Sequence, residues 1–125
     1  MAISGAGVSF TPVVKTVTRI LSGLSGSSVA AEGLIPAGAI PIRVSTKVVE
    51  ELGDGNEITG YTVGDGSDAD RWGDITGLAV GTSSDNLDWT VGTIEAFPSG
   101  GDVVLTPTGG DFDGDGAIEI TVEYL

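Results

Sequence analysis

Residues 117–125 read AIEITVEYL, and their side chains alternate between apolar and polar. Successive side chains of a β-strand point to opposite faces of a sheet, so this pattern predicts a strand with one buried face. The expected buried residues are Ile118, Ile120, Val122 and Tyr124. This is the clearest alternation in the sequence, and it indicates a β protein.

The same period of two recurs along the chain. In residues 39–49, Ile40, Ile42 and Val44 alternate with polar or small residues. Pro41 has no N–H to donate, so this strand is expected to begin at a sheet edge. The full set of expected strands is residues 11–21, 39–49, 57–63, 75–80, 87–97, 102–107 and 117–125.

Turn-forming residues separate these segments. The 21 glycines and five prolines interrupt the chain at the spacing that is typical of antiparallel sandwiches. Residues 45–52 also allow a helical turn around Glu50 and Glu51, but the β-branched residues around them favour a strand. The sequence therefore predicts an all-β fold, an antiparallel β-sandwich or jelly roll, in a single domain.

Composition excludes several classes of function. The 125 residues include 18 Asp or Glu, five Lys or Arg, no His and no Cys, and the net charge is −13. No Ser-His-Asp triad, Cys/His nucleophile, thiolate zinc site or disulfide can form. The acidity argues against nucleic acid and anionic membranes as partners. No secretory signal or membrane-spanning run is recognisable, so synthesis in the cytoplasm is expected.

Charge is unevenly distributed along the chain. Residues 1–49 have a net charge of +3, whereas residues 50–125 have a net charge of −16 and contain Arg71 as their only base. Two interpretations of residues 1–32 stay open: an N-terminal arm that a partner orders, or a first strand followed by a Ser/Gly-rich loop. Residues 33–125 then form the β-sandwich domain.

An acidic motif, DFDGDGAIE, begins at Asp111. Asp111, Asp113 and Asp115 alternate before a glycine, as in the first half of an EF-hand loop. Calcium takes six to eight oxygen ligands, and Glu119 could add one directly or through water. The twelfth position is Val122 instead of Glu, and a strand follows instead of a helix. The hypothesis is a calcium site on a β scaffold, and the alternative is a solvated acidic turn.

A second acidic segment reads GDGSDADRWGD. Its Asp65, Asp68 and Asp70 could meet a cation, but Arg71 supplies a counter-ion within the same loop. We therefore interpret the segment as a loop held by an Asp–Arg pair, with Trp72 packed over it.

No enzymatic activity is expected. A pair of carboxylates at a separation suited to glycoside hydrolysis can always be found among 18 acids, so such a pair carries little information. Trp72 and Trp89 are more often core or turn residues than sugar platforms. The Gly-rich stretches lack the strand-to-helix context and the lysine of a phosphate loop. No catalytic residue is nominated, and calcium is the only cofactor that the sequence suggests.

Three segments of the sequence form a recognisable set. They are residues 33–40 (GLIPAGAI), 63–73 (VGDGSDADRWG) and 102–110 (DVVLTPTGG). Together with the terminal strand, they resemble short β-rich virion proteins of tailed bacteriophages and gene transfer agents, of the capsid decoration (cement) type. The resemblance covers residues 33–125 and includes neither residues 1–32 nor the aspartate triplet.

This resemblance implies a small β-sandwich that binds and stabilises the surface of a phage head. Such proteins commonly sit as trimers at three-fold positions and clamp neighbouring subunits, which implies a homotrimer bound to the major capsid protein of the virion. The alternatives are a head- or tail-fibre or receptor-binding module, and a calcium-stabilised adhesive domain. The charge distribution adds an expectation: the basic end faces the capsid and the acidic loops face outward.

Overall fold

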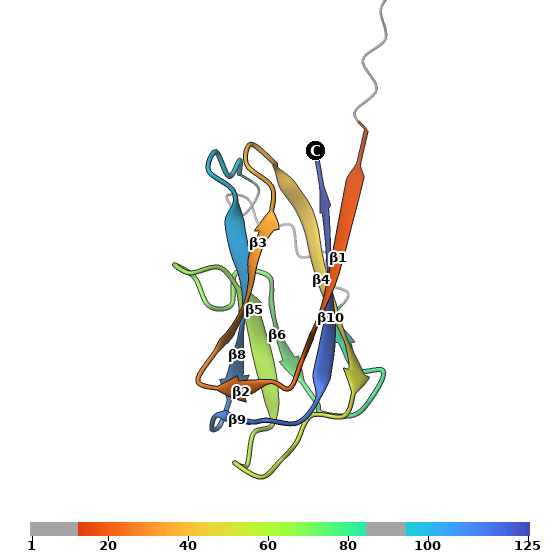
Figure 1. Cartoon of the computed structure of the whole chain (residues 1–125), viewed down its shortest axis with the longest axis vertical. Helices are drawn as coiled ribbons and strands as arrows, with labels where there is room; N and C mark the ends of the chain where they lie inside the picture. The colour runs from red at the N-terminus through yellow and green to blue at the C-terminus, as the bar shows by residue number, and fades with distance from the viewer. Residues whose placement is uncertain (1–12, 85–94) are drawn as a thin grey trace, which may run out of the picture.

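Two antiparallel sheets face each other in the computed structural model, which describes residues 13–84 and 95–125 (Figure 1). Sheet I has the strand order β1-β10-β4-β7, and sheet II has the order β3-β8-β5-β6. The strands of sheet I are β1 (Lys15–Ser22), β10 (Ala117–Tyr124), β4 (Pro41–Glu50) and β7 (Ser83–Ser84). Those of sheet II are β3 (Val29–Ile35), β8 (Gly101–Thr108), β5 (Gly60–Gly64) and β6 (Gly73–Thr76). A short pair, β2 (Ser25–Gly26) with β9 (Phe112–Asp113), lies at one end.

The all-β sandwich predicted from the sequence is confirmed. The alternating segment 117–125 becomes β10, which lies between β1 and β4 and pairs with both. Its inward side chains Ile118, Ile120 and Val122 are fully buried. The segments 39–49 and 102–107 become β4 and β8 within two residues at each end, and residues 45–50 are strand, as the β-branched residues favoured.

Other strand predictions need correction. The segment 75–80 is strand only to Thr76, because Gly77 adopts a φ of 133° and the chain then makes a turn in which Thr82 N–H donates to the Ala79 carbonyl. β3 was not expected, because its small residues hide the alternation, and the short β2, β7 and β9 were also missed. Most of the predicted strand 87–97 lies outside the described residues; Phe97 forms an isolated bridge with Ala39.

The described part of residues 1–32 is built into the sandwich. β1 joins sheet I, while β3 joins sheet II, and the boundary expected between residues 32 and 33 falls inside β3. The Arg19 guanidinium joins the two sheets on this side, since its Nη1 donates to the Glu32 carbonyl oxygen at 2.7 Å. Residues 13–32 therefore contribute strands to both layers.

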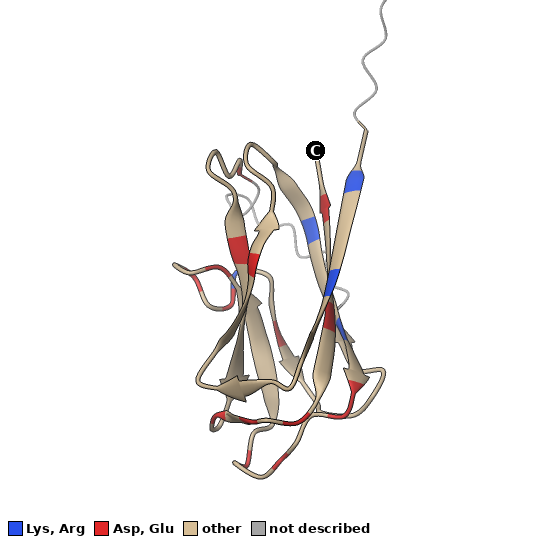
Figure 2. Ribbon diagram, in the orientation of Figure 1, with Lys and Arg blue, Asp and Glu red and all other residues tan. Residues whose placement is uncertain are grey.

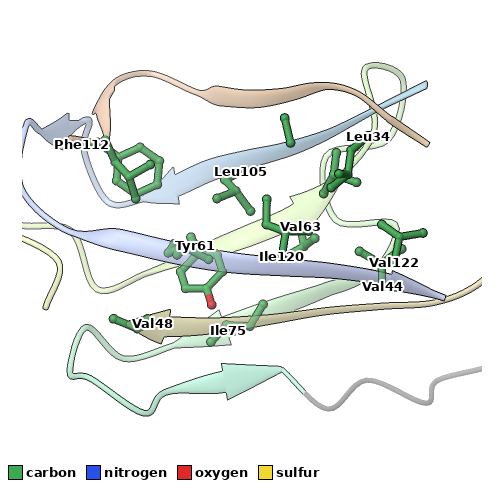
Figure 3. Packing of buried hydrophobic residues seen from close by; sticks show 14 of the residues in the cluster. Leu34, Val44, Val48, Tyr61, Val63, Ile75, Leu105, Phe112, Ile120 and Val122 are labelled. Atoms are coloured by element: carbon green, nitrogen blue, oxygen red, sulfur yellow. The ribbon is translucent and has the colours of Figure 1, made fainter. Parts of the chain in front are cut away.

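The core lies between the two sheets and is almost entirely apolar (Figure 3). Sheet I contributes buried valines and isoleucines from β4 and β10, and sheet II contributes Tyr61, Val63, Val103 and Leu105. One polar contact crosses this core: the Tyr61 hydroxyl lies 2.8 Å from the Thr46 hydroxyl. Both residues are at most 2 % exposed, so a hydrogen bond links the layers where water is excluded.

The described ranges hold strands and loops without a helix. They accordingly contain no helix of the length and hydropathy that a membrane span requires.

Candidate functional surfaces

Acidic side chains gather in the loops at one end of the molecule, and most basic side chains lie on strands, where acids also occur (Figure 2). Four of the five basic residues are on two strands of sheet I, with Lys15 and Arg19 on β1 and Arg43 and Lys47 on β4. The fifth, Arg71, is in the β5–β6 loop. The loops 51–59 and 109–116, at the end of the sandwich opposite the C-terminus, contain six acids and no base.

The outer face of sheet I is mixed in charge. The register of β10 with β4 places Glu119 opposite Lys47 and Glu123 opposite Arg43. Opposite charges on directly facing residues stabilise an antiparallel pair. The bases of β4 are thus matched by acids of β10. β1 has no acid, and its two bases lie on the opposite face of sheet I: Lys15 and Arg19 are in register with Tyr124 and Ile120, and Arg19 reaches β3.

At the acidic end, Asp113 holds two loops together. Its Oδ2 accepts the Gly55 N–H at 2.9 Å, and its Oδ1 accepts the Asp115 N–H at 3.1 Å. The carboxylate lies directly over Gly53, where a methyl group would overlap it. Asn56 adds a second link, because its Nδ2 donates to the Asp111 carbonyl oxygen at 3.1 Å. The loops 51–59 and 109–116 are therefore joined through an aspartate that accepts backbone hydrogen bonds.

The four residues of the predicted calcium site are not brought to one point. Asp115 lines a hollow of about 320 Å³ together with Glu50, Glu51 and Asp54, while Glu119 lies on the outer face of β10, opposite Lys47. Within the residues that the structure describes, no three acidic side chains are grouped as a metal site would require. Calcium binding by Asp111, Asp113, Asp115 and Glu119 stays a prediction.

Replacing Asp113 by Ala is expected to lower the free energy of unfolding by about 1–2 kcal/mol, because two backbone N–H groups lose their acceptor. The measurement is chemical unfolding in chelator and again in millimolar calcium, with Asp111→Ala as the control that keeps the Asp113 contacts. A ligand of the native state must raise the melting temperature. An unchanged wild-type melting temperature in calcium would contradict the calcium hypothesis, and an undiminished stability of Asp113→Ala would contradict the loop-joining role.

The β5–β6 loop is held by Arg71, as the sequence indicated. Arg71 Nη1 lies 3.0 Å from Asp65 Oδ2 and 2.8 Å from Glu95 Oε1. The side chains of Arg71 and Asp65 are 10 % and 11 % exposed, whereas that of Glu95 is 60 % exposed. The Asp65 contact is therefore the one shielded from water, and it is the stronger of the two.

Asp65 also closes the loop on itself. Its Oδ1 accepts the N–H groups of Ser67 and Asp68 at 2.8 and 2.7 Å. Partial burial alone would raise the pKa of Asp65, but these two N–H groups and the Arg71 guanidinium together outweigh burial and hold the pKa below its ordinary value. In contrast, a side-chain hydrogen bond with Asp70 raises the pKa of Asp68.

The guanidinium of Arg71 also contacts two aromatic rings. Its Cζ lies 5.5 Å from the Trp72 centroid and 5.2 Å from the Phe97 centroid, and the two ring centroids are 6.2 Å apart. Trp72 is partly buried and packs against the core, whereas the sequence analysis expected it to pack over the loop. Phe97 and Glu95 were missed by the sequence analysis, because they are more than 20 positions from Arg71 and no local pattern connects them.

An open hollow of about 510 Å³ lies beside this loop, lined among others by Asp65, Ser67, Phe97 and Asp102. The receptor-binding alternative requires an exposed groove at Trp72 or Trp89. Trp72 is not among the residues that line this hollow, and Trp89 lies outside the described residues. One wall is fixed by Asp102, whose Oδ1 accepts the Gly33 N–H at 2.8 Å.

Comparison with known proteins finds similarity in structure. One similar chain is in the acidic stable capsid structure of Helicobacter pylori bacteriophage KHP30, with a TM-score of 0.58, 17% identity and coverage of 91% of this chain and 89% of that chain. Another is in the cyanophage Pam1 capsid asymmetric unit, with a TM-score of 0.57, 18% identity and coverage of 98% and 96%. No family model and no curated protein matches the sequence. The resemblance to phage virion proteins is thus confirmed at the level of the fold.

Proposed function

We propose that this chain is a structural protein of a phage virion, and specifically a decoration (cement) protein that binds the outer surface of the capsid as a homotrimer. The observation that supports the proposal is the shared fold: over nine-tenths of the chain aligns with chains of two phage capsid structures. The sequence resemblance over residues 33–125 points to the same class of protein. The proposal includes the major capsid protein as the partner and assigns no catalytic residue.

The separation of charge supports a direction of binding. Sheet I has four of the five bases and three acids (Glu50, Glu119 and Glu123), whereas the loops at one end have six acids and no base. A crowded particle surface stays dispersed when the outward parts of its proteins share one sign of charge. We therefore assign sheet I to the capsid side and the acidic loops 51–59 and 109–116 to the solvent side.

Copy number on the purified particle tests the proposal. A decoration protein that covers the head is expected in hundreds of copies by quantitative gel, with density on the head surface by electron microscopy. A fibre or receptor-binding module would instead be present in a few tens of copies at the tail. Absence from the head surface would contradict the proposal.

A charge-neutralising pair of variants tests the direction of binding. Arg43→Gln with Lys47→Gln is expected to weaken binding to undecorated capsids at least tenfold, because Glu119 and Glu123 then lose the bases opposite them and the outer face of sheet I becomes negative, which repels an acidic capsid surface. The matched control is Asp54→Asn with Asp115→Asn, which changes two charges at the acidic end and is expected to bind as the wild type does. Cosedimentation at physiological salt measures both. Equal binding by the two double variants would show that sheet I does not face the capsid.

A further inference from the structure

β1 is an edge strand with one open side. All eight of its residues pair with β10, and within residues 13–84 and 95–125 no second strand pairs with it. It lies along the side of the sandwich in Figure 1. An edge of this length presents a row of backbone donors and acceptors to which another chain can add a strand.

The ladder shows which backbone groups face outward. Gly23 N–H donates to the Gly116 carbonyl oxygen at 3.0 Å, and these two residues continue the register in which Ser22 faces Ala117. In an antiparallel pair, directly opposite residues exchange hydrogen bonds at every second position. The backbone groups directed away from β10 therefore belong to the alternate residues Thr16, Thr18, Ile20 and Ser22.

This outward row lacks the charged residues that usually protect an edge. Its members are hydroxyl-bearing or apolar, and Ile20 is 55 % exposed. Val13 and Val14, which directly precede the strand, are 70 % and 50 % exposed. Arg19, a residue that could block the edge, is instead hydrogen-bonded across to β3.

The charge of β1 indicates the chemistry of its partner. The strand has two bases and no acid in a chain with a net charge of −13. Oppositely charged residues on facing strands stabilise their pairing, and like charges oppose it. An extended segment with acidic side chains fits this edge better than a basic one.

We propose that β1 binds the capsid by strand addition: an extended, acidic segment of the capsid shell protein pairs with the open edge of β1 and extends sheet I. This inference rests on the proposed function and names the surface that makes the contact. Backbone hydrogen bonds to the outward residues of β1 would supply affinity, and Lys15 and Arg19 would select the acidic segment.

Thr18→Pro tests the proposal with little disturbance of the fold. The N–H of Thr18 faces away from β10, and proline is tolerated in an edge strand where its missing N–H would face solvent. Thr18→Ala keeps the N–H and is the matched control. In cosedimentation with capsid particles that lack this protein, Thr18→Pro is expected to lose binding at least tenfold, while Thr18→Ala binds as the wild type does. Circular dichroism and the melting temperature of the free proteins show whether each variant is folded.

A second pair of variants leaves the backbone untouched. Ile20→Lys places a charge on the open edge, and Ile20→Thr keeps the position uncharged; the first should weaken capsid binding and the second should retain it. If Thr18→Pro is unfolded, the comparison of Ile20→Lys with Ile20→Thr still tests strand addition at β1.

The outcomes are distinguishable. If the wild type binds capsids and both Thr18→Pro and Ile20→Lys bind equally well, strand addition at β1 is wrong while the proposed function stands. If the wild type does not bind at all, the proposed function itself fails. Light scattering compares the free wild type with the free variants. If the wild type is an oligomer and Thr18→Pro and Ile20→Lys are monomers, β1 is an interface between copies of this chain and the proposal is overturned.

Discussion

Replacing Tyr61 by Ala is expected to lower the free energy of unfolding by about 3–5 kcal/mol, the largest effect of any substitution considered. Tyr61 on β5 is fully buried, and its hydroxyl contacts Thr46 on β4 at 2.8 Å. Loss of the ring leaves a cavity between the sheets and removes their hydrogen bond. In thermal unfolding, the melting temperature should fall by about 10–20 °C for a domain of this size.

Tyr61→Phe separates the two contributions. It keeps the ring and removes only the hydroxyl, so a loss of about 1–2 kcal/mol is expected. Burial raises the pKa of the Tyr61 phenol, and the Thr46 hydrogen bond opposes this only in part. The neutral phenol of Tyr61 therefore stabilises the folded state fully below the unfolded-state pKa of about 10. This contribution to the free energy of unfolding is lost as the pH rises through the raised folded-state pKa. Tyr61→Phe should be less sensitive to alkali than the wild type, and equal sensitivity would contradict this account.

The second large effect is expected for Arg71→Ala, with a loss of about 3 kcal/mol at pH 7. Removal of the guanidinium leaves the shielded Asp65 carboxylate without its partner, and it also removes the contacts with the Trp72 and Phe97 rings. Arg71→Lys keeps the charge but not the planar group that stacks on the rings, so its loss should be smaller. Urea unfolding of the wild type, Arg71→Ala and Arg71→Lys measures the free energy of unfolding of each protein.

The pH dependence of this loss follows from Asp65. The folded-state pKa of Asp65 is lowered, so its contribution to stability is present above the unfolded-state pKa of about 3.9 and is lost as the pH falls through the folded-state value. The difference between wild type and Arg71→Ala should therefore shrink from pH 5 towards pH 2, because a protonated Asp65 needs no counter-ion. A difference that stays constant would show that ring contacts, and not the ion pair, supply the stability.

The strands that could be predicted were those whose burial follows one alternating pattern. β10 alternates Ile118, Ile120 and Val122 with polar residues, and each of these three is buried in the core. β3 has the sequence VAAEGLI, in which alanine is apolar but small and the alternation is weak. Ala31 is nevertheless fully buried, because β3 pairs with β8 about 70 positions away. A pairing with such a distant strand cannot be recognised from the sequence of β3 itself.

The two acidic loops show the same limit for the candidate sites. The pairing of Arg71 with an aspartate of its own loop was predicted from their closeness in the sequence, and the structure identifies the partner as Asp65, six positions away. The aspartates of residues 111–115 matched half of a calcium loop, but Asp113 accepts a hydrogen bond from Gly55, 58 positions away. A motif shows which ligands a segment can offer, whereas a distant loop can use the same carboxylate as a backbone acceptor.

The sequence by itself determined the all-β class, the central strands of the sandwich, the acidic loops and the lack of His and Cys chemistry. These properties depend on composition and on the alternation of apolar and polar residues over a few positions. Both can be recognised within one segment, without knowing which strands it pairs with. Tertiary structure decided that β1 lies at the edge of sheet I, that four bases share one sheet, and that Asp113 joins two loops. Those features depend on which strands pair across the chain, and pairing is selected by burial of the whole core. The candidate capsid-binding edge exists only because β10 lies between β1 and β4.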